Sequence, residues 1–583
     1  MKNNQCERVD GSFIERDFSQ FFSFLFDELL NYLLILPKTS VSEAFNKCNT
    51  FSQFQKYVKR NLQTTHSHLF GKYSTPNDIA RFMVERAVEQ KSISANSTVL
   101  DLCAGTGVFT SNFCEMLFEY FKKNDSNRPP INLKYNIVKK NLRTVDTDPL
   151  ATYILRIRVL LWFLKSNPNS NQLQKFVRML TNKCEIGNSF TLKSLLTEKF
   201  DIIISNPPYL SEKSNKHYFD QMIPEKNSIF YKPRLDYYLH FLGFAFEHIK
   251  PSGILCFITP NYFLHTKSAI FIRKYIKTYS NRMEFYDFEN QSLFHKAPGF
   301  HSCIFTITMG SIKDFTKKEL IYHNIPSNRT DIISYSNVFL QEHDYMIKFR
   351  PEPDFKNLKF YKRTLGDISI VRQGVIAGPD RIRKKHKKLR SNSDISINNG
   401  VFIVSKDFLN QIELTEKERE CILPFFYVRD LHQSKYLNFD PLPVKNYIIY
   451  MNNIAFQESL YPNLIRHLKP FKSIMEQRRE TKIGKRHWFE LHWPRQKELF
   501  THARILIIRR TIKPRFIYTE KPFVTDLSCN ILQPKYKIDL RALHEYLESS
   551  EVAKWINYYA KNKGNMLQID KSLIESIPIP DEF

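Results

Sequence analysis

Two patterns of apolar and polar positions follow one another along the first half of the chain. Residues 1–65 place apolar side chains at helical spacing, which predicts an N-terminal helical segment. Between about residues 95 and 310, short apolar runs alternate with longer helix-like stretches. The strand-like runs are STVLDLC, LRTVDTD, FDIIISN, GILCFITP, MEFYDFE and SCIFTITM. This alternation predicts a doubly wound α/β sheet, with an antiparallel hairpin where the later strands come closer together.

Turn and linker signals divide the chain further. Before the first strand, Thr75 and Pro76 are suited to the N-cap and first position of a helix. Residues 316–360 are polar and contain several prolines, which predicts a linker region. The domains expected are therefore 66–315, an α/β domain, and 361–583, a second, mixed α/β domain of short strands, turns and helices.

Charge and cysteine usage narrow the class of protein. The formal net charge is +27, which indicates a polyanionic partner, although a lysine-rich solvated surface gives the same sum. The nine cysteines include no CxxC pair, so neither a zinc ribbon nor a disulfide framework is expected. The pattern is typical of a reducing cytoplasm. The N-terminus has no signal-peptide core, and LLNYLLILP is too short to span a bilayer, so no membrane partner is expected.

The stretch VLDLCAGTGVF carries the first candidate chemistry. An apolar strand ends at Asp101 and is followed by Gly105, Thr106 and Gly107 before a helix-like run. Such a turn lets a ligand approach the backbone at a helix N-terminus. The full GxGxxG pattern is absent, which disfavours a nicotinamide cofactor. A tight strand–helix connection without a ligand is the alternative.

Two further strand ends carry polar residues. Asp146 ends the second strand, where an acidic side chain accepts hydrogen bonds from ribose hydroxyls. Asp148, directly before Pro149, fits a helix cap instead, and both roles are compatible. Gly187 and Asn188 end a third strand. In one interpretation, the amide of Asn188 lies near an adenine ring. In the other, the two residues form an ordinary turn.

The stretch SNPPYL follows the apolar run of Ile202 to Ile204. Two prolines end a central strand, because each removes a backbone donor and fixes φ. They also hold the side-chain oxygen of Asn206 and the carbonyl oxygen of Pro207 rigidly, as two acceptors for one exocyclic NH₂ group. Pro208 stiffens the turn and Tyr209 offers a flat ring to a base. The pattern predicts a site that methylates a planar amine, with a simple strand terminator as the alternative.

The ordered set STPNDIARFMV, VLDLCAGTG, TVDTDP, IGNSF and FDIIISNPPYL resembles the N6-adenine DNA methyltransferases of restriction–modification systems, in the gamma-type motif order. The resemblance covers nearly all of the chain beyond residue 65, and NPPY is its specific part. It implies a Rossmann-like class I methyltransferase domain with a mostly parallel seven-stranded sheet, and S-adenosylmethionine as methyl donor. At position 188 the family most often has an acidic residue, and Asn stands here. The residues that it implies around the donor are Thr75, Asp101, Ala104, Gly105, Gly107, Asp146 and Asn188.

The resemblance also implies the path of the reaction. Asn206, Pro207, Pro208 and Tyr209 would form the catalytic motif, and the target adenine would flip out of the duplex and stack on Tyr209. A second stacking aromatic is expected before the last strands, with Phe294 as first choice and Phe300 as second. A core position is the alternative for Phe294.

The second domain carries three basic runs with aromatic residues between them, DRIRKKHKKLR, EQRRETKIGKRHWFELHW and ARILIIRRTIKPRF. One such run is usually a solvated face, but three beside a base-modifying site predict DNA binding. The segments TLGDISIVRQGVIAGPD and KGNMLQIDKSLIESIPIP resemble the ends of a target-recognition domain. The expected DNA contacts are Arg383, Lys384, Lys385, Arg478, Arg479, Arg509 and Arg510.

Several chemistries are not supported by the sequence. It has no Pro-Cys nucleophile motif for cytosine C5 methylation and no GxxxxGK[ST] phosphate loop, and no metal site is expected. We therefore predict a monomeric, cytoplasmic adenine-N6 DNA methyltransferase that acts on double-stranded DNA. A separate restriction endonuclease stays open as a partner. NPPY suits any planar amine or amide, so RNA adenine and a protein glutamine side chain stay open as substrates.

Overall fold

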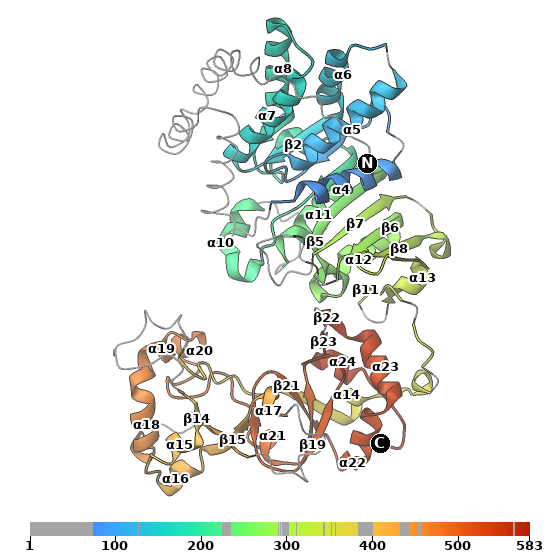
Figure 1. Cartoon of the computed structure of the whole chain (residues 1–583). Helices are drawn as coiled ribbons and strands as arrows, with labels where there is room; N and C mark the ends of the chain where they lie inside the picture. Colours follow the sequence, from blue (N-terminus) through green and yellow to red (C-terminus); the bar gives the residue numbers. More distant parts are fainter. Residues whose placement is uncertain are drawn as a thin grey trace, which may run out of the picture. The chain divides into compact units, whose positions relative to one another are not determined.

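The computed structural model describes residues 74–583 except 92, 126, 224–234, 290, 292, 294–301, 311, 342–343, 351, 356, 383–399, 432–442, 453–457 and 564–565. The chain divides into two compact units, Met1–Phe349 and Arg350–Phe583 (Figure 1). The helical segment expected at residues 1–65 lies outside the described residues.

A nine-stranded sheet, in the order β3-β2-β1-β4-β5-β7-β6-β8-β9, is the centre of the described part of the first unit. The first five strands of this order are mutually parallel, and β7 lies antiparallel between β5 and β6. The strands of this unit are β1 Val99–Asp101, β2 Leu142–Asp146, β3 Cys184–Ile186, β4 Phe200–Ser205, β5 Ile249–Pro260, β6 Ser280–Asp287, β7 Ser302–Met309, β8 Glu319–Asn324, β9 Arg329–Ser334, β10 Phe339–Leu340 and β11 Met346–Ile347.

The sheet is larger than the seven strands expected. Strands β8 and β9 extend it with a hairpin, and they lie within residues 316–360, which were predicted to be a linker region. The prediction failed because these strands are short and mostly half-exposed, so their apolar positions are few. Leu320 and Ile333 are nevertheless buried in the core. The boundary between the compact units falls later, after Phe349.

Helices cover both faces of the sheet, which explains the unbroken apolar run in β4. Ile202 and Ile204 join one core cluster with α4, α5, α7 and α8, whereas Ile203 joins the other with α11 and α12. A strand buried on both faces has no polar side to alternate with. The helices are α4 Asn77–Gln90, α5 Val108–Asn124, α6 Pro130–Asn136, α7 Pro149–Leu164, α8 Ser170–Lys183, α9 Lys193–Leu196, α10 Glu212–Met222, α11 Tyr237–His248, α12 Ile270–Tyr279 and α13 Tyr335–Val338.

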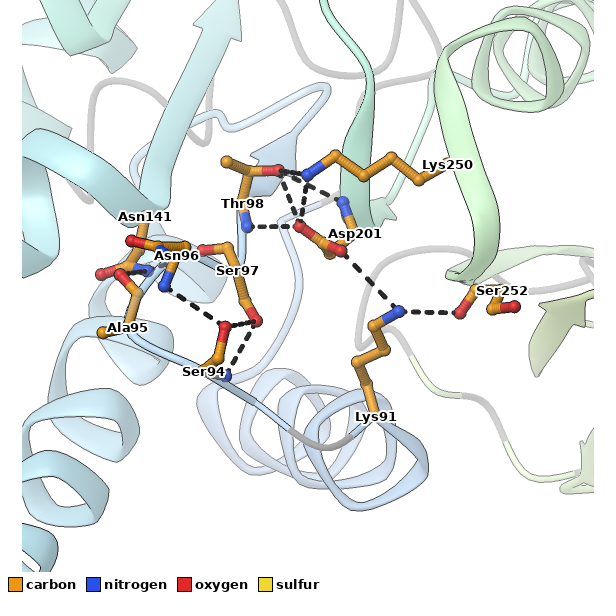
Figure 2. Close-up of polar contacts among 10 residues, drawn as sticks. All are labelled: Lys91, Ser94, Ala95, Asn96, Ser97, Thr98, Asn141, Asp201, Lys250 and Ser252. Carbon is orange, nitrogen blue, oxygen red and sulfur yellow. Dashed lines mark hydrogen bonds and ion pairs between the residues drawn. The ribbon is translucent and has the colours of Figure 1, made fainter.

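A polar network ties the strands together at their amino ends (Figure 2). The carboxylate of Asp201 on β4 accepts hydrogen bonds from the backbone N–H of Thr98 at 2.9 Å and from the Nζ of Lys250 on β5 at 2.7 Å. Lys91, just after α4, lies 3.7 Å from the same carboxylate and donates to the carbonyl of Ser252. One carboxylate thus joins β4 and β5 to the residue before β1, at the end of the sheet opposite the polar strand ends predicted to carry function.

The second unit contains small sheets rather than one large one. Four-stranded sheets β13-β21-β17-β19 and β14-β16-β15-β20 are accompanied by β18-β23-β22 and by the pair β12-β24. Its strands are β12 Arg363–Thr364, β13 Ser369–Gln373, β14 Ile403–Ser405, β15 Ile422–Phe426, β16 Asn446–Ile449, β17 Arg504–Ile508, β18 Arg510–Thr511, β19 Phe516–Thr519, β20 Val524–Thr525, β21 Cys529–Pro534, β22 Lys561–Lys563, β23 Met566–Gln568 and β24 Pro578–Ile579.

Short helices connect these sheets around an apolar core that includes Phe402, Ile448 and Leu506. The helices are α14 Leu365–Ile368, α15 Lys406–Leu409, α16 Glu416–Arg419, α17 Val428–Leu431, α18 Pro462–Leu468, α19 Lys472–Glu476, α20 Arg479–Lys482, α21 Glu498–Thr501, α22 Leu540–Leu547, α23 Ser550–Tyr559 and α24 Lys571–Glu575. Across the described ranges of both units, none of the helices has the length and apolar character needed to cross a bilayer.

Candidate functional site

The predicted polar residues of the first unit converge at the carboxyl ends of adjacent parallel strands. Asp101 ends β1, Asp146 ends β2, and Asn206 follows β4 directly. Strand β1 pairs with β2 on one side and β4 on the other, so the strand order reverses there. Ligands of doubly wound sheets bind at such a reversal, outside the carboxyl ends of the strands.

The glycine turn after β1 is held by Asp146. The backbone N–H of Gly105 donates to the Oδ2 of Asp146 at 2.8 Å, and the N–H of Asp148 donates to its Oδ1 at 2.8 Å. Gly107 has φ +78°, and a Cβ there would lie 2.5 Å from the Cγ of Leu155 on α7. Gly105 has φ +53°, but a Cβ there would meet no atom of the described residues within 4 Å. The turn therefore packs against α7 at Gly107 and has space beside Gly105.

Asp101 is a buried carboxyl with one unsatisfied oxygen. Its side chain is 1% exposed, and its Oδ2 accepts a hydrogen bond from the hydroxyl of Thr110 on α5 at 2.7 Å. Its Oδ1 is buried without a hydrogen-bond partner among the residues that the structure describes. Burial raises the pKa of Asp101 to about 7, with the negative charge of Asp146 acting in the same direction and the hydrogen bond from Thr110 against it. A buried oxygen without a partner favours a ligand that donates to it.

Asn206 lies against Thr75. Its Nδ2 donates to the Oγ1 of Thr75 at 2.9 Å, and Thr75 is itself 8% exposed. The sequence predicted Thr75 as a helix cap, but the helix begins one residue later, with Pro76 at the N-cap position and no side-chain capping bond. The hydroxyl of Thr75 instead accepts from the amide of Asn206 and so orients that side chain.

The prolines and tyrosine of SNPPYL pack closely. Pro207 is buried and Pro208 half-buried. Tyr209 is 7% exposed, and its hydroxyl donates to the carbonyl of Ile258 on β5 at 3.1 Å. Its ring meets that of Tyr238 on α11 edge to face, with the centroids 6.5 Å apart. The tyrosine is thus fixed at both ends, by the backbone at its Cα and by β5 at its hydroxyl.

The amide of Asn188 is engaged with its own chain. Its Nδ2 donates to the carbonyl of Met222 at 2.7 Å, and its Oδ1 accepts from the backbone N–H of Phe190 at 3.1 Å. The next residue, Ser189, is buried, and its hydroxyl donates to the carbonyl of Leu102 at 3.1 Å. Asn188 thus joins the segment after β3 to the end of α10, and Ser189 joins it to the residue after β1.

Some predicted residues lie outside the described residues, and others were not foreseen. Phe294 and Phe300 fall in the first group, as do Arg383, Lys384 and Lys385. Thr110 and Ser189 were missed. Their signal in the sequence is weak, because a hydroxyl nine residues after Asp101 gains meaning only when the first turn of α5 places it there.

The arginines predicted to bind DNA divide into two kinds. All five N–H donors of Arg478 bond to backbone carbonyls, those of Met475, Gly378, Glu490, His487 and Trp488. Arg509 donates to the carbonyl of Leu527 and pairs with Asp570 at 3.2 Å. These two side chains bond to their own unit, and their contact with DNA stays a prediction. Arg479 and Arg510 are exposed.

The strand order and the cluster of polar strand ends define the class of the first unit, a doubly wound α/β domain with its site at the strand reversal. Residues 140–294 match the family described as Eco57I restriction-modification methylase. This stretch includes Asp146 at the end of β2, Asn188 after β3 and all of SNPPYL.

Relatives with known names are similar over a longer range. The chain is 21% identical over 438 residues to the Type II methyltransferase M.HindII of Haemophilus influenzae, covering 67% of this chain and 76% of the relative. It is 22% identical over 415 residues to M.HincII of Haemophilus influenzae, with the same coverage. These relatives are Type II methyltransferases.

One solved structure supports the fold of most of the chain. The structure of the Type IIL restriction-modification enzyme MmeI in complex with DNA matches with a TM-score of 0.56 at 11% sequence identity. The match covers 86% of this chain and 64% of MmeI, so this chain corresponds to less than two thirds of that enzyme. At this identity the likeness concerns the fold alone.

Proposed function

We propose that the protein is a DNA methyltransferase of the restriction–modification type, which transfers a methyl group from S-adenosylmethionine to the N6 of adenine in double-stranded DNA. The observation that carries the proposal is the position of SNPPYL. Asn206 follows β4 beside the end of β1, with its amide oriented by Thr75. The match of residues 140–294 to restriction-modification methylases and the similarity to Type II methyltransferases support it.

The residues at the strand ends suit this methyl donor. The unsatisfied Oδ1 of Asp101 accepts a hydrogen bond from a cationic or N–H-bearing group, and the ammonium of a methionine moiety is one. The space beside Gly105 allows close approach of a ligand to the backbone. Asp146, which accepts from two backbone N–H groups at the end of β2, is the acidic residue proposed for the ribose hydroxyls. Asn188 is suited less well to the donor's adenine, because its amide is already bonded to Met222 and Phe190.

Bound S-adenosylmethionine supplies an electrophilic methyl group on a sulfonium, which becomes a thioether once the methyl has left. The chain's part is to orient the amine that receives it. The side-chain oxygen of Asn206 and the carbonyl oxygen of Pro207 would accept hydrogen bonds from the two N6–H groups, which would turn the nitrogen lone pair out of conjugation with the ring. The new bond is N6–C, and the extra N6 proton passes to water. Positioning accounts for most of the rate enhancement.

The target base has to leave the helical stack to reach this site, because N6 lies inside the duplex. Tyr209 would stack on the extruded adenine, with its plane fixed by the hydroxyl bond to Ile258. Phe294 or Phe300 would cover the opposite face of the base.

Two substitutions test the assignment of the motif. Asn206→Ala removes one acceptor, and Pro207→Thr loosens the other, so we expect methyl transfer to fall roughly a hundredfold or more. DNA affinity should stay near that of the wild type, because neither side chain contacts phosphate in the proposal. Transfer of labelled methyl to DNA and gel-shift affinity measure the two effects. Asn124→Ala, an exposed position at the end of α5, is the matched control. Full activity in both variants would contradict the proposal.

The substrate needs a separate test, since RNA adenine and protein glutamine fit the same motif. Labelled donor is incubated with duplex DNA, ribosomal RNA and release-factor protein in parallel. We expect label in DNA, and N6-methyladenine after nucleoside digestion. Label in RNA or protein alone would replace the proposed substrate while leaving the methyl-transfer site in place.

A further inference from the structure

A group of charged side chains surrounds Tyr427 in the second unit. Strands β15 and β20 run parallel, with Phe425 paired to Val524 and Phe426 to Thr525. Tyr427 and Asp526 directly follow the last residues of these two strands, so the chain leaves the sheet at neighbouring positions. Both follow carboxyl ends of parallel strands, where connecting segments most often carry function.

A third segment runs alongside these two strand ends. Val375 bonds through its N–H to the carbonyl of Thr525 at 2.9 Å and forms a bridge with Asp526. Gly374 permits this approach, because a Cβ there would lie 2.2 Å from the carbonyl oxygen of Asp526. The segment continues to Asp380, whose carbonyl accepts from the N–H of Val401 at 2.9 Å, and to Arg381, which forms a bridge with Gly400.

Arg429 completes the arrangement. Its guanidinium lies over the ring of Tyr427, 4.9 Å from the centroid, and 71% of its side chain is exposed. Burial raises the pKa of Tyr427, and the charges of Asp380, Arg381, Arg429 and Asp526 all act on its hydroxyl. These four side chains and the tyrosine, here termed the Tyr427 cluster, thus gather from three segments of the unit.

The mixture of charges distinguishes this cluster from a surface that follows the DNA backbone. Carboxylates repel phosphates, and a surface built for phosphate contact has no use for Asp380 and Asp526 beside its arginines. Base edges in the major groove present both kinds of partner. Arginine donates to the O6 and N7 of guanine, and carboxylates accept from the N4 of cytosine.

We propose that the Tyr427 cluster contacts base edges in the major groove and sets part of the DNA sequence that the protein methylates. Arg429 and Arg381 supply donors, Asp380 supplies an acceptor, and Tyr427 stiffens Arg429 by stacking. The inference rests on the proposed function, since it concerns the choice of site by the same enzyme.

Local ion pairing is the competing explanation for these charges. Arg381 lies 3.6 Å from Asp380, and Arg429 lies 3.8 Å from Asp430, in both cases between sequence neighbours. Pairs of this kind at exposed positions contribute little to folding. The exposed fraction of Arg381 is 42%, so both guanidinium groups can exchange these partners for a base.

The test compares methylation motifs. Wild type, Arg429→Ala, Arg429→Lys, Asp380→Asn and Arg541→Ala are each expressed in a host without DNA methyltransferases, and modified bases are located by sequencing. Arg429→Lys keeps the charge but loses the two-pronged geometry. Arg541, 66% exposed and paired with Glu520 on the same unit, is the matched control. Purified variants are also assayed on the wild-type site, and thermal unfolding checks their fold.

We expect Arg429→Ala and Arg429→Lys to lose specificity at one base pair of the motif, the same in both variants. Asp380→Asn should also lose specificity at one base pair. Methylation of the wild-type site should fall roughly tenfold to a hundredfold in each. Arg541→Ala should keep the motif and the rate. An unchanged motif in Arg429→Ala and Asp380→Asn would overturn the inference. So would an equal loss of methylation at all sites in Arg429→Ala that is absent in Arg429→Lys, because charge alone would then explain the effect. Absence of methylated DNA in the wild type itself would instead refute the proposed function and the inference with it.

Discussion

Two carboxyl groups at adjacent strand ends show how the surroundings of a residue determine its protonation state. Asp146 accepts backbone N–H groups at both oxygens. Asp101, one strand away, accepts from the hydroxyl of Thr110, and its other, buried oxygen has no partner within the described part of the chain. Hydrogen bonds stabilise the charged form of a carboxyl, whereas burial without them disfavours it. The same residue type therefore serves two different purposes at one site.

The state of Asp101 predicts a pH-dependent stability. The unfolded chain releases this proton near pH 4, whereas the folded unit keeps it up to about pH 7. The folded state binds more protons in that window, so the contribution of Asp101 to the free energy of unfolding falls as pH rises through it. Asp101→Asn removes this dependence and still accepts from Thr110. We expect the variant to gain stability relative to the wild type between pH 5 and 8, on the order of a few kcal/mol.

Urea unfolding of both proteins at several pH values measures this difference. Asp201→Asn serves as a contrast, because the pKa of Asp201 is shifted in the opposite direction. A constant difference between Asp101→Asn and the wild type across pH 5 to 8 would show that the carboxyl is already ionised in the folded unit.

At the scale of elements, the sheet is anchored at its two ends in different ways. The carboxyl ends carry the candidate site, with an unsatisfied oxygen at Asp101, whereas the amino ends carry the satisfied network around Asp201. Burial tends to raise the pKa of Asp201, but hydrogen bonds from Lys250 and Thr98 outweigh it, and the pKa lies below its ordinary value. The amino ends thus hold a bonded polar network, whereas the carboxyl ends hold the residues of the candidate site.

Asp201→Asn should destabilise the first unit by ~2 kcal/mol at neutral pH, because hydrogen bonds to a charged acceptor are lost. A lowered pKa adds stability above the unfolded value near pH 4, and this stability is lost as pH falls through the folded value. The difference between variant and wild type should therefore shrink toward zero below pH 4. Urea unfolding at pH 7 and near pH 3.5 checks both parts, with methyl transfer at pH 7 expected to persist. An equal effect at both pH values would mean that the charge of Asp201 is not what holds β1, β4 and β5.

The elements also show what the sequence could predict. The runs around β1, β2 and β4 were identified because buried parallel strands are apolar throughout and end abruptly, at Asp101, Asp146 and Asn206. Strands β8 and β9 were missed because an edge hairpin buries few residues. The bond between Thr75 and Asn206 was beyond sequence reasoning, since 131 positions separate the two residues and only the packing of α4 joins them.

At the scale of the whole molecule, the composition gives the net charge but not the positions of the charged side chains in the fold. A net charge of +27 indicates a polyanionic partner, but it does not say which arginines face that partner. Arg478 and Arg479 are adjacent in one basic run. Arg478 bonds to five carbonyls of its own unit, and burial lowers its pKa to about 10, whereas Arg479 is exposed at the start of α20. The fold thus divides a basic run into side chains that bond to the domain itself and side chains that face solvent.

Arg478 and Arg479 form a matched pair for separating effects on stability from effects on DNA affinity. Arg478→Ala leaves several buried carbonyls without donors, so we expect it to destabilise the second unit by roughly 3 kcal/mol. Arg479→Ala should change stability by no more than ~0.5 kcal/mol. It should instead weaken DNA binding to all sequences alike and reduce the slope of log affinity against log salt by about 1. Thermal unfolding and salt-dependent fluorescence anisotropy with duplex DNA measure the two effects. If Arg479→Ala leaves both affinity and slope unchanged, the phosphate contacts of this unit come from other residues, and the basic run around α20 is a solvated face.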